Sequence, residues 1–254
     1  MNKLRGKVAI ITGGSGGIGK ATAEAFIEEG ANVLIFDLNE SDLIKSCKDI
    51  GSNNLSYFVG DVTKYEDNIK AVEIVKEKYG GLDIFVANAG IEGEVKNIEE
   101  YDIDMVDQVI AVNIKGPFLG LKASIPAMSL RKGGSFIITS SVTGLTGSPG
   151  IAPYGTSKHA VIGLMRAAAK ECAEKNIRVN TVNPSPVETR MMRSLEEGLM
   201  PGEANEAKTM LEANIPLGRY AMPTDVAKLI LFLSSEDSSF ITGSVYTVDG
   251  GSTA

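Results

Sequence analysis

The sequence predicts one α/β domain in which helices cover both faces of a parallel, doubly wound sheet of about seven strands. Short runs rich in β-branched residues recur along the chain, most of them separated by stretches of helix length: residues 8–11, 32–37, 57–59, 83–87, 135–139, 178–182 and 244–248. Because these runs are almost continuously apolar, both faces of the sheet must be covered. The length of 254 residues fits one domain spanning residues 1–254, and no linker-like stretch marks a boundary.

Composition argues against several classes of function. The formal net charge of −7 disfavours a nucleic-acid partner, because such affinity depends chiefly on clustered lysine and arginine. Cys47 and Cys172 are the only cysteines and lack metal-ligand spacing, so we expect neither a disulfide framework nor a metal site. No apolar run approaches the roughly 20 residues of a membrane span. We therefore expect a cytoplasmic protein with no membrane partner.

The first strand leads into the stretch "ITGGSGGIGKAT" at residues 11–22, which fits three motifs. A dinucleotide-binding fingerprint, G-x-G-x-x-G, begins at Gly14, and most of a nucleoside-triphosphate P-loop spans residues 14–20. The pattern G-x-S-x-G around Ser15 is typical of a hydrolase nucleophile elbow. All three motifs need a strand, a tight turn and a helix, so the stretch by itself does not distinguish them.

The second strand favours the dinucleotide motif, which requires an acidic residue about 20 positions after the glycines. Asp37 ends this strand, and its carboxylate would bind the adenosine ribose and repel the 2′-phosphate of NADP. Leu38 follows where an arginine would reverse that preference, so NAD is favoured, although a merely solvated aspartate would leave the same pattern. A P-loop would need Ser or Thr at Ala21, and an elbow would need the sole histidine, His159, as its base. Both motifs stay open as weaker alternatives.

A second set of polar residues follows the fifth strand. Ser141 lies just after residues 135–139, and Tyr154 and Lys158 are four positions apart, which places them on one helix face. Ligands of parallel sheets bind beyond the carboxyl ends of the strands. Each residue alone is compatible with a turn or a surface pair, but together they indicate a catalytic site.

At these positions the chain resembles the short-chain dehydrogenase/reductase family, and the resemblance extends from about Gly6 to Gly251. The shared residues, in chain order, are Thr12, Gly13, Gly17 and Gly19 (T-G-x3-G-x-G), Asp61 and Val62, Asn88, Ala89 and Gly90, Asn113, and the set Ser141, Tyr154 and Lys158. Singly these motifs are weak, whereas their order and spacing are highly specific. The resemblance implies a Rossmann-like fold and an NAD-dependent oxidoreductase.

The resemblance also implies catalytic roles. Tyr154 would act as the general base in oxidation and as the acid in reduction, while Ser141 would hydrogen-bond the substrate oxygen. Lys158 would bind the nicotinamide ribose, and Asn113 would position a water that passes protons to solvent. Free tyrosine, with a pKa near 10, is a poor base at neutral pH. We expect the Lys158 ammonium and the positive nicotinamide ring to lower the pKa of Tyr154.

Cofactor contacts follow from the same resemblance. The helix N-terminus after the glycine turn should hold the pyrophosphate. Residues 61–62 should flank the adenine, Asn88 should lie by a ribose, and the segment after the sixth strand should hold the nicotinamide carboxamide. The cofactor-binding residues expected are Gly13, Ser15, Gly17, Ile18, Gly19, Asp37, Leu38, Asp61, Val62, Asn88, Ala89, Gly90, Tyr154, Lys158, Pro184, Val187 and Thr189. Ser185 stands where the family usually has glycine, which leaves the conformation of this loop open.

Residues 190–215, here called the lid segment, fall where the family has a variable substrate lid. Methionines and leucines give the segment an adaptable apolar surface, so we expect an apolar secondary alcohol or its ketone as substrate. The small residues 167–169 resemble the helix faces through which relatives form tetramers, and a homotetramer is expected.

Two other functions compete with this one. The family also contains 3-oxoacyl-thioester reductases, for which Arg131 and Lys132 would dock an acidic carrier protein. Asp37 counts against such an enzyme, which normally uses NADPH. A non-catalytic NAD-sensing protein is the other alternative, and the intact set of Ser141, Tyr154 and Lys158 argues against it.

Overall fold

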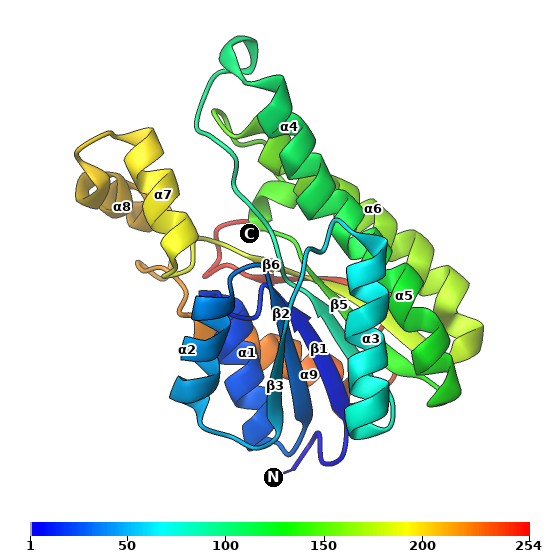
Figure 1. Ribbon diagram of the computed structural model, residues 1–254. Coiled ribbons are helices and arrows are strands. Elements are labelled where there is room, and N and C mark those ends of the chain that lie inside the picture. The colour runs from blue at the N-terminus through cyan, green and yellow to red at the C-terminus, as the bar shows by residue number, and fades with distance from the viewer. Residues whose placement is uncertain (1) are drawn as a thin grey trace.

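Seven parallel strands form one sheet in the order β3-β2-β1-β4-β5-β6-β7. A computed structural model describes residues 2–254, and the predicted fold class is confirmed (Figure 1). The strands are β1 (Val8–Thr12), β2 (Asn32–Asp37), β3 (Leu55–Val59), β4 (Ile84–Ala87), β5 (Gly134–Thr139), β6 (Ile177–Pro184) and β7 (Val245–Val248). The strand order reverses at β1, which lies between β2 and β4, and such a reversal opens a crevice at the carboxyl ends of the strands.

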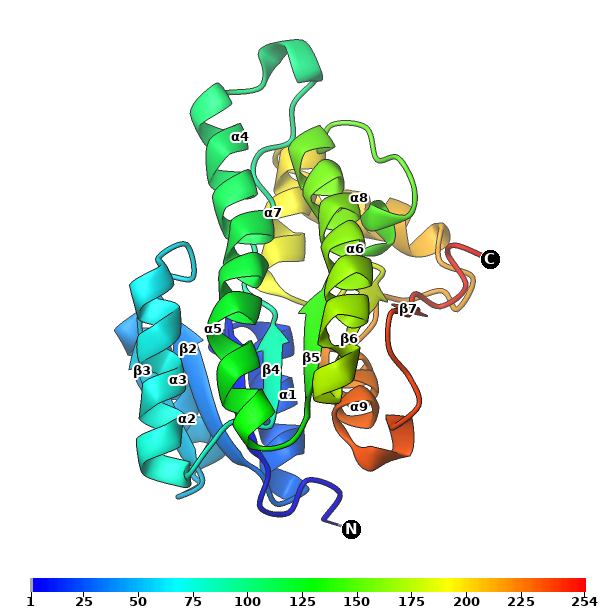
Figure 2. The same cartoon turned by 90° about the vertical axis from the view of Figure 1, so that its right-hand side faces the viewer.

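Helices cover both faces of the sheet (Figure 2). One face carries α3 (Tyr65–Tyr79), α5 (Gly116–Leu130) and α6 (Ala152–Cys172), and the other carries α1 (Gly17–Glu28), α2 (Glu40–Ile50) and α9 (Pro223–Ser234). Helix α4 (Ile103–Ile110) runs through a π-helical turn, η2 (Ala111–Lys115), directly into α5. Short 3-10 turns occur at η1 (Ile98–Glu100), η3 (Val142–Gly144), η4 (Ala173–Lys175) and η5 (Glu236–Ser238).

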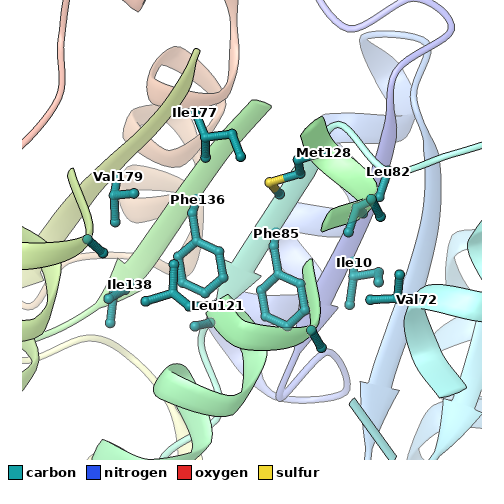
Figure 3. Close-up of a cluster of buried hydrophobic side chains, with 14 of the residues drawn as sticks. Ile10, Val72, Leu82, Phe85, Leu121, Met128, Phe136, Ile138, Ile177 and Val179 are labelled. Atoms are coloured by element: carbon teal, nitrogen blue, oxygen red, sulfur yellow. The ribbon is translucent and has the colours of Figure 1, made fainter. Parts of the chain in front are cut away.

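Each strand contributes to two hydrophobic cores, one on each face of the sheet. In β1, Val8 and Ile10 pack toward α3, α5 and α6, whereas Ala9 and Ile11 pack toward α1, α2 and α9. Phe85 of β4 and Phe136 of β5 stack in the first core with ring centroids 4.9 Å apart and planes 4° from parallel (Figure 3). Two-sided burial is why the strands read as unbroken apolar runs in the sequence.

Helices α7 (Arg190–Leu199) and α8 (Ala204–Ala213) stand together beyond the carboxyl ends of the strands, within the lid segment (Figure 1). Their connections to the sheet are paired: the main chain of Val187 forms a parallel bridge with that of Ala221. The lid segment therefore joins the body of the molecule through two adjacent strand-like stalks.

One expectation needs correction. Ala167 is exposed on α6, but Ala168 and Ala169 are buried in the core, so the three alanines do not form one outward face as expected. None of the helices described in residues 2–254 is long and apolar enough to cross a membrane. The same residues contain no cluster of three or more His, Cys, Asp or Glu side chains suited to a metal ion.

Candidate functional site

The glycine turn between β1 and α1 is tight enough to exclude side chains. Gly13 has a φ of 62°, and a Cβ there would lie 2.9 Å from the Cα of Ala89. A Cβ on Gly19 would collide with the carbonyl oxygen of Gly13. No side chain caps α1, so its first N–H groups point into the crevice without a protein acceptor. The turn therefore has the form of an anion cradle at a helix N-terminus.

Asp37 reaches from the end of β2 to this turn. Its Oδ2 accepts hydrogen bonds from the amide of Ser15 at 3.1 Å and from the Ser15 hydroxyl at 2.5 Å. Its Oδ1 accepts the amide of Leu38 at 2.8 Å, while the Leu38 side chain is exposed. The carboxylate is thus held at the rim of the crevice by three donors.

The loops after β1 and β4 are tied to each other through Thr12. Its Oγ1 accepts the amides of Asn88 at 3.0 Å and Ala89 at 3.1 Å. The Asn88 side chain donates to the carbonyl of Gly13 at 3.3 Å and accepts from Thr139 at 3.2 Å. Asn88 therefore lies in the crevice as a bridge between β1, β4 and β5.

Asp61 and Val62 lie just beyond the end of β3, as expected. Asp61 caps its own turn by accepting from the amide and the hydroxyl of Thr63 at 2.9 and 2.7 Å. The Val62 side chain packs against the core below α5, where a Cβ on Gly116 would lie 3.2 Å from its Cγ2. Both residues are well placed on the crevice wall nearest β2 and β3.

Ser141, Tyr154 and Lys158 are all buried and lie close together beyond β5. The Lys158 ammonium donates to the carbonyl of Thr139 at 2.9 Å and lies 5.4 Å from the centre of the Tyr154 ring. Ser141 is the N-cap of η3 and accepts the amide of Thr143 at 3.2 Å. Their exposed fractions are only 8% for Ser141, 9% for Tyr154 and 5% for Lys158.

Burial shifts both titratable groups of this set away from their charged forms. The pKa of Tyr154 is raised to about 12: desolvation raises it most, the hydrogen bond with Ser141 lowers it, and the charge of Glu92 adds a smaller increase. Desolvation lowers the pKa of Lys158 to about 8. The protein by itself thus moves the pKa of Tyr154 in the direction opposite to that expected for a base, because desolvation is the largest of these contributions.

Asn113 lies in the π-helical turn between α4 and α5 and is 1% exposed. Its Oδ1 accepts the amide of Ile91 at 2.9 Å, and its Nδ2 donates to the Ile91 carbonyl at 2.9 Å and to the Ser157 hydroxyl at 3.0 Å. Both ends of the amide therefore hold the loop after β4 against α6, next to Lys158. The role of Asn113 in holding a water stays a prediction.

The segment after β6 passes directly over the glycine turn. A Cβ on Gly17 would lie 2.9 Å from the Cγ2 of Thr189. The Ser185 amide donates to the Val248 carbonyl at 3.1 Å, and Ser185 keeps a negative φ, so serine fits without strain where the family usually has glycine. Pro184 and Val187 are buried on either side of it, at the base of the lid segment.

A cavity of about 380 Å³ lies between the loop of residues 92–95 and α7. The loop is fixed by Tyr101, whose hydroxyl bonds both the amide and the carbonyl of Glu94 at 2.8 Å. Helix α7 comes so close to the loop that a Cβ on Gly198 would lie 2.7 Å from the Cγ2 of Val95. Glu92, whose negative charge raises the pKa of Tyr154, lines the cavity on the side of the loop.

The two alternative motifs at the glycine stretch, the nucleophile elbow and the P-loop, lack the side-chain arrangements that they require. Ser15 donates its hydroxyl to Asp37, whereas His159 is exposed and hydrogen-bonds the Gly155 carbonyl of its own helix at 2.9 Å. Lys20 points outward and pairs with Asp49 at 2.7 Å.

Several side chains at the site were not identified from the sequence. Thr139 offers only a main-chain carbonyl to Lys158, and Ser157 acts through a partner 44 positions away in the chain. Glu92 carries no motif, although its position two residues after the N-A-G sequence is a usable signal. These contacts depend on how distant elements pack.

Comparison with known proteins gives matches over nearly the whole chain. A family model described as enoyl-(acyl carrier protein) reductase matches residues 13–253. The 3-oxoacyl-(acyl-carrier-protein) reductase FabG of Thermotoga maritima is 40% identical over 251 residues, covering 98% of each chain. Cyclohexanol dehydrogenase of an Acinetobacter species is 36% identical over 255 residues, covering 100% of this chain and 97% of that protein.

A solved structure adds the three-dimensional comparison. The crystal structure of 3-ketoacyl-(acyl-carrier-protein) reductase from Brucella melitensis, complexed with NADH, superposes with a TM-score of 0.92 at 30% identity. The superposition covers 99% of this chain and 100% of that chain.

Proposed function

Because the chain belongs to the short-chain dehydrogenase/reductase family, we propose that it transfers hydride between NAD(H) and an apolar secondary alcohol or its ketone. The observation that carries the proposal is the cluster of Ser141, Tyr154 and Lys158, buried together at the carboxyl edge of the sheet beside the crevice. A tyrosine and a lysine that are both shifted toward their neutral forms by burial are typical of a proton-transfer site.

The described residues fit a nicotinamide dinucleotide. The glycine turn leaves no room for a Cβ at Gly13 or Gly19, and its amides suit a pyrophosphate. Asp37 would hold the adenosine ribose, Asp61 and Val62 would flank the adenine, and Pro184, Val187 and Thr189 would hold the carboxamide end. The bound nicotinamide would supply the hydride acceptor for oxidation or the hydride donor for reduction.

The side chains of the protein would hold the substrate and move its proton. The Ser141 hydroxyl would hydrogen-bond the substrate oxygen, and Tyr154 would take the hydroxyl proton during oxidation or return it during reduction. Lys158 is still mostly protonated at neutral pH, with its pKa at about 8, so its charge favours the phenolate form of Tyr154. Burial of all three groups would exclude water from the reacting atoms.

NAD is proposed over NADP because of the charge at the end of β2. The Asp37 carboxylate is already oriented by Ser15 and faces the crevice rim, and a 2′-phosphate there would meet a negative charge. Leu38 supplies no compensating cation. The Brucella melitensis relative was crystallised with NADH, which is compatible with this choice.

The substrate class is proposed from the lid segment and from relatives. Leu195 is a buried residue of α7 that lines the cavity, and Met191 and Met192 lie half-buried on the same helix. Adaptable thioethers suit an apolar ligand. One similar protein is named as a cyclohexanol dehydrogenase, which favours a cyclic alcohol.

The second candidate is a 3-oxoacyl-thioester reductase, supported by the 40% identity to the Thermotoga maritima enzyme. Arg131 is not free to dock an acidic carrier protein for such an enzyme, because its guanidinium pairs with both carboxylate oxygens of Asp83 at 3.2 Å. Arg131 and Lys132 also precede β5, whereas the proposed site follows it, roughly 20 Å away along a six-residue strand. A non-catalytic NAD sensor remains the third candidate.

A homotetramer in the cytoplasm is proposed for the assembly. Phe118 on α5 is 52% exposed and Ala167 on α6 faces outward, so these helices offer an apolar surface for another subunit. Sedimentation velocity tests the assembly, and a monomer at micromolar concentration would contradict it.

The experiment that tests the function is a screen of secondary alcohols and ketones with NAD⁺, NADP⁺, NADH and NADPH, read at 340 nm. The panel should include cyclohexanol, linear 2-alkanols and a 3-oxoacyl thioester. Preferred turnover of a cyclic alcohol with NAD⁺ would support the proposal. Preferred reduction of the thioester with NADPH would select the second candidate, and tight NADH binding without turnover would select the sensor.

A further inference from the structure

Charged side chains form a network at the base of the lid segment, beside the proposed cofactor contacts. The network consists of Glu188, Arg193, Glu196, Lys208 and Glu212. Arg193 donates to Glu188 at 2.8 Å and to Glu196 at 2.7 Å. Lys208 pairs with Glu188 and lies 3.7 Å from Glu212. This charge network joins the stalk after β6 to both lid helices.

Glu188 is the residue that both cations of the charge network share. Arg193 pairs with Glu196 within α7, and Lys208 pairs with Glu212 within α8, so those two contacts stay inside one helix each. Glu188 alone lies outside the helices and reaches both. Hydrogen bonds from Lys208 and Arg193 hold the pKa of Glu188 below its usual range, so the carboxylate is ionised at neutral pH.

The main chain of Glu188 is hydrogen-bonded to the second stalk of the lid segment. Its amide donates to the Ala221 carbonyl at 2.9 Å, and the Ala221 amide donates to the Pro186 carbonyl at 3.0 Å. The two stalks of the lid segment are therefore paired at this point. Glu188 has its main chain in the stalk and its carboxylate in the lid, so the position of one constrains the position of the other.

The same arrangement links Glu188 to the two places where ligands are proposed to bind. Val187 and Thr189, its neighbours in the chain, are the proposed nicotinamide contacts. Helix α7 forms one wall of the cavity of about 380 Å³, and the loop that carries Glu92 forms the other. A change in the α7 position would alter the shape of that cavity without touching the catalytic side chains.

We propose that Glu188 is a positioning residue that holds α7 and α8 in register with the cofactor segment, so that cofactor binding and substrate-cavity shape are coupled through its two ion pairs. This inference rests on the proposed function for the identity of the ligands. Glu188 touches no reacting atom, and its loss should weaken ligand binding while leaving the chemical step nearly unchanged.

The test compares Glu188→Gln with Glu206→Gln, an exposed position on α8 that takes no part in the charge network. Glu188→Gln keeps the shape of the side chain and removes the charge. We expect it to raise KM for the alcohol about 3- to 20-fold, in the range of partly buried ion pairs, with kcat within about twofold of wild type. Glu188→Asp should recover part of the loss, and Glu206→Gln should behave as wild type.

Limited proteolysis supplies a readout that needs no turnover. Cleavage within residues 190–213 should be several-fold faster in Glu188→Gln than in wild type without cofactor. NADH should slow cleavage in wild type and do so less in the variant. A fall in kcat with unchanged KM, or cleavage rates equal to those of Glu206→Gln, would overturn the inference.

The outcomes separate the inference from the proposed function. If the wild type binds NADH but oxidises no alcohol, the proposed function fails, and the inference is decided by whether NADH protects the lid segment through Glu188. If the wild type turns over an alcohol and Glu188→Gln matches it in KM and in proteolysis, the inference alone fails. Absence of NADH binding to the wild type would overturn both.

Discussion

The Lys158 ammonium lies 5.4 Å from the centre of the Tyr154 ring, and both side chains are enclosed by protein. Burial makes the charged form of each group costly, and it shifts their pKa values away from each other, up to about 12 for Tyr154 and down to about 8 for Lys158. A buried phenol at neutral pH is a proton donor, which suits reduction directly. Oxidation needs an added positive charge beside the phenol, and the oxidised nicotinamide ring would supply one.

Tyr154→Phe removes only the hydroxyl that would carry the proton. We expect kcat/KM to fall about 10²- to 10⁴-fold, the usual range for loss of a general acid or base. The Kd for NADH, measured by fluorescence titration, should stay within about threefold of wild type. Tyr79→Phe is the matched control, because the Tyr79 hydroxyl bonds Ser56 at 3.0 Å away from the site. Near-normal turnover by Tyr154→Phe would refute the assignment.

Lys158→Met should stabilise the protein while abolishing activity. Burial lowers the pKa of Lys158 to about 8 from its ordinary value of 10.5, so below pH 8 the folded state holds a buried charge that the unfolded state hydrates freely. After allowing for the lost hydrogen bond to Thr139, the gain in unfolding free energy at pH 7 should be about 2 kcal/mol.

The sign of that effect depends on pH. Between pH 8 and 10.5 the unfolded chain binds a proton at Lys158 that the folded chain does not, so wild-type stability rises with pH there. The advantage of Lys158→Met should therefore be greatest below pH 8 and shrink toward pH 10.5. Denaturant titrations at several pH values measure it, with the exposed Lys170→Met on the same helix as control. A destabilised Lys158→Met at pH 7 would contradict the burial argument.

The fold class was predictable because its signals are local. Each of these signals spans only a few consecutive residues: the strand runs, the glycine turn at Gly13, and the four-residue spacing of Tyr154 and Lys158. Strand ends were less predictable: β6 runs to Pro184 rather than ending at 182, because the polar residues Asn180 and Asn183 are buried in it and hydrogen-bonded.

Contacts that depend on packing were not predictable. The Thr139 carbonyl accepts a hydrogen bond from Lys158, and the Ser157 hydroxyl accepts one from Asn113, but no sequence pattern indicates either contact. The direction of the Tyr154 pKa shift was also missed, since it depends on how deeply the phenol is enclosed. Sequence patterns indicated which residues to propose as reactive groups, and tertiary structure determines the environment of those residues.

Glu92→Gln should shift the pH profile of oxidation to lower pH. The negative charge of Glu92 raises the pKa of Tyr154 after desolvation has done so, and removing the charge leaves the phenolate easier to form. Since oxidation requires the deprotonated phenol, the alkaline rise in kcat/KM should move down by about 0.3–1 pH unit. Glu99→Gln, on the exposed turn η1, is the control. An unchanged or upward-shifted profile would exclude this role for Glu92.

Asp37→Asn should relax the preference for NADH. The substitution keeps the size of the side chain and removes the charge that would repel a 2′-phosphate, so the ratio of NADPH to NADH affinity should rise at least about tenfold.

Ser15→Ala separates the charge of Asp37 from its orientation, because it removes the 2.5 Å hydroxyl contact but keeps the hydrogen bond from the Ser15 amide to Asp37 at 3.1 Å. NADH should then bind about 3- to 10-fold more weakly, while NADPH is still rejected, since the carboxylate remains ionised but less well oriented. Fluorescence titration of NADH and NADPH against the wild type and both variants measures these affinities. Tighter binding of NADPH than of NADH by the wild type would reverse the cofactor assignment. A Ser15→Ala variant with wild-type NADH affinity would show that Asp37 needs no support from the glycine turn.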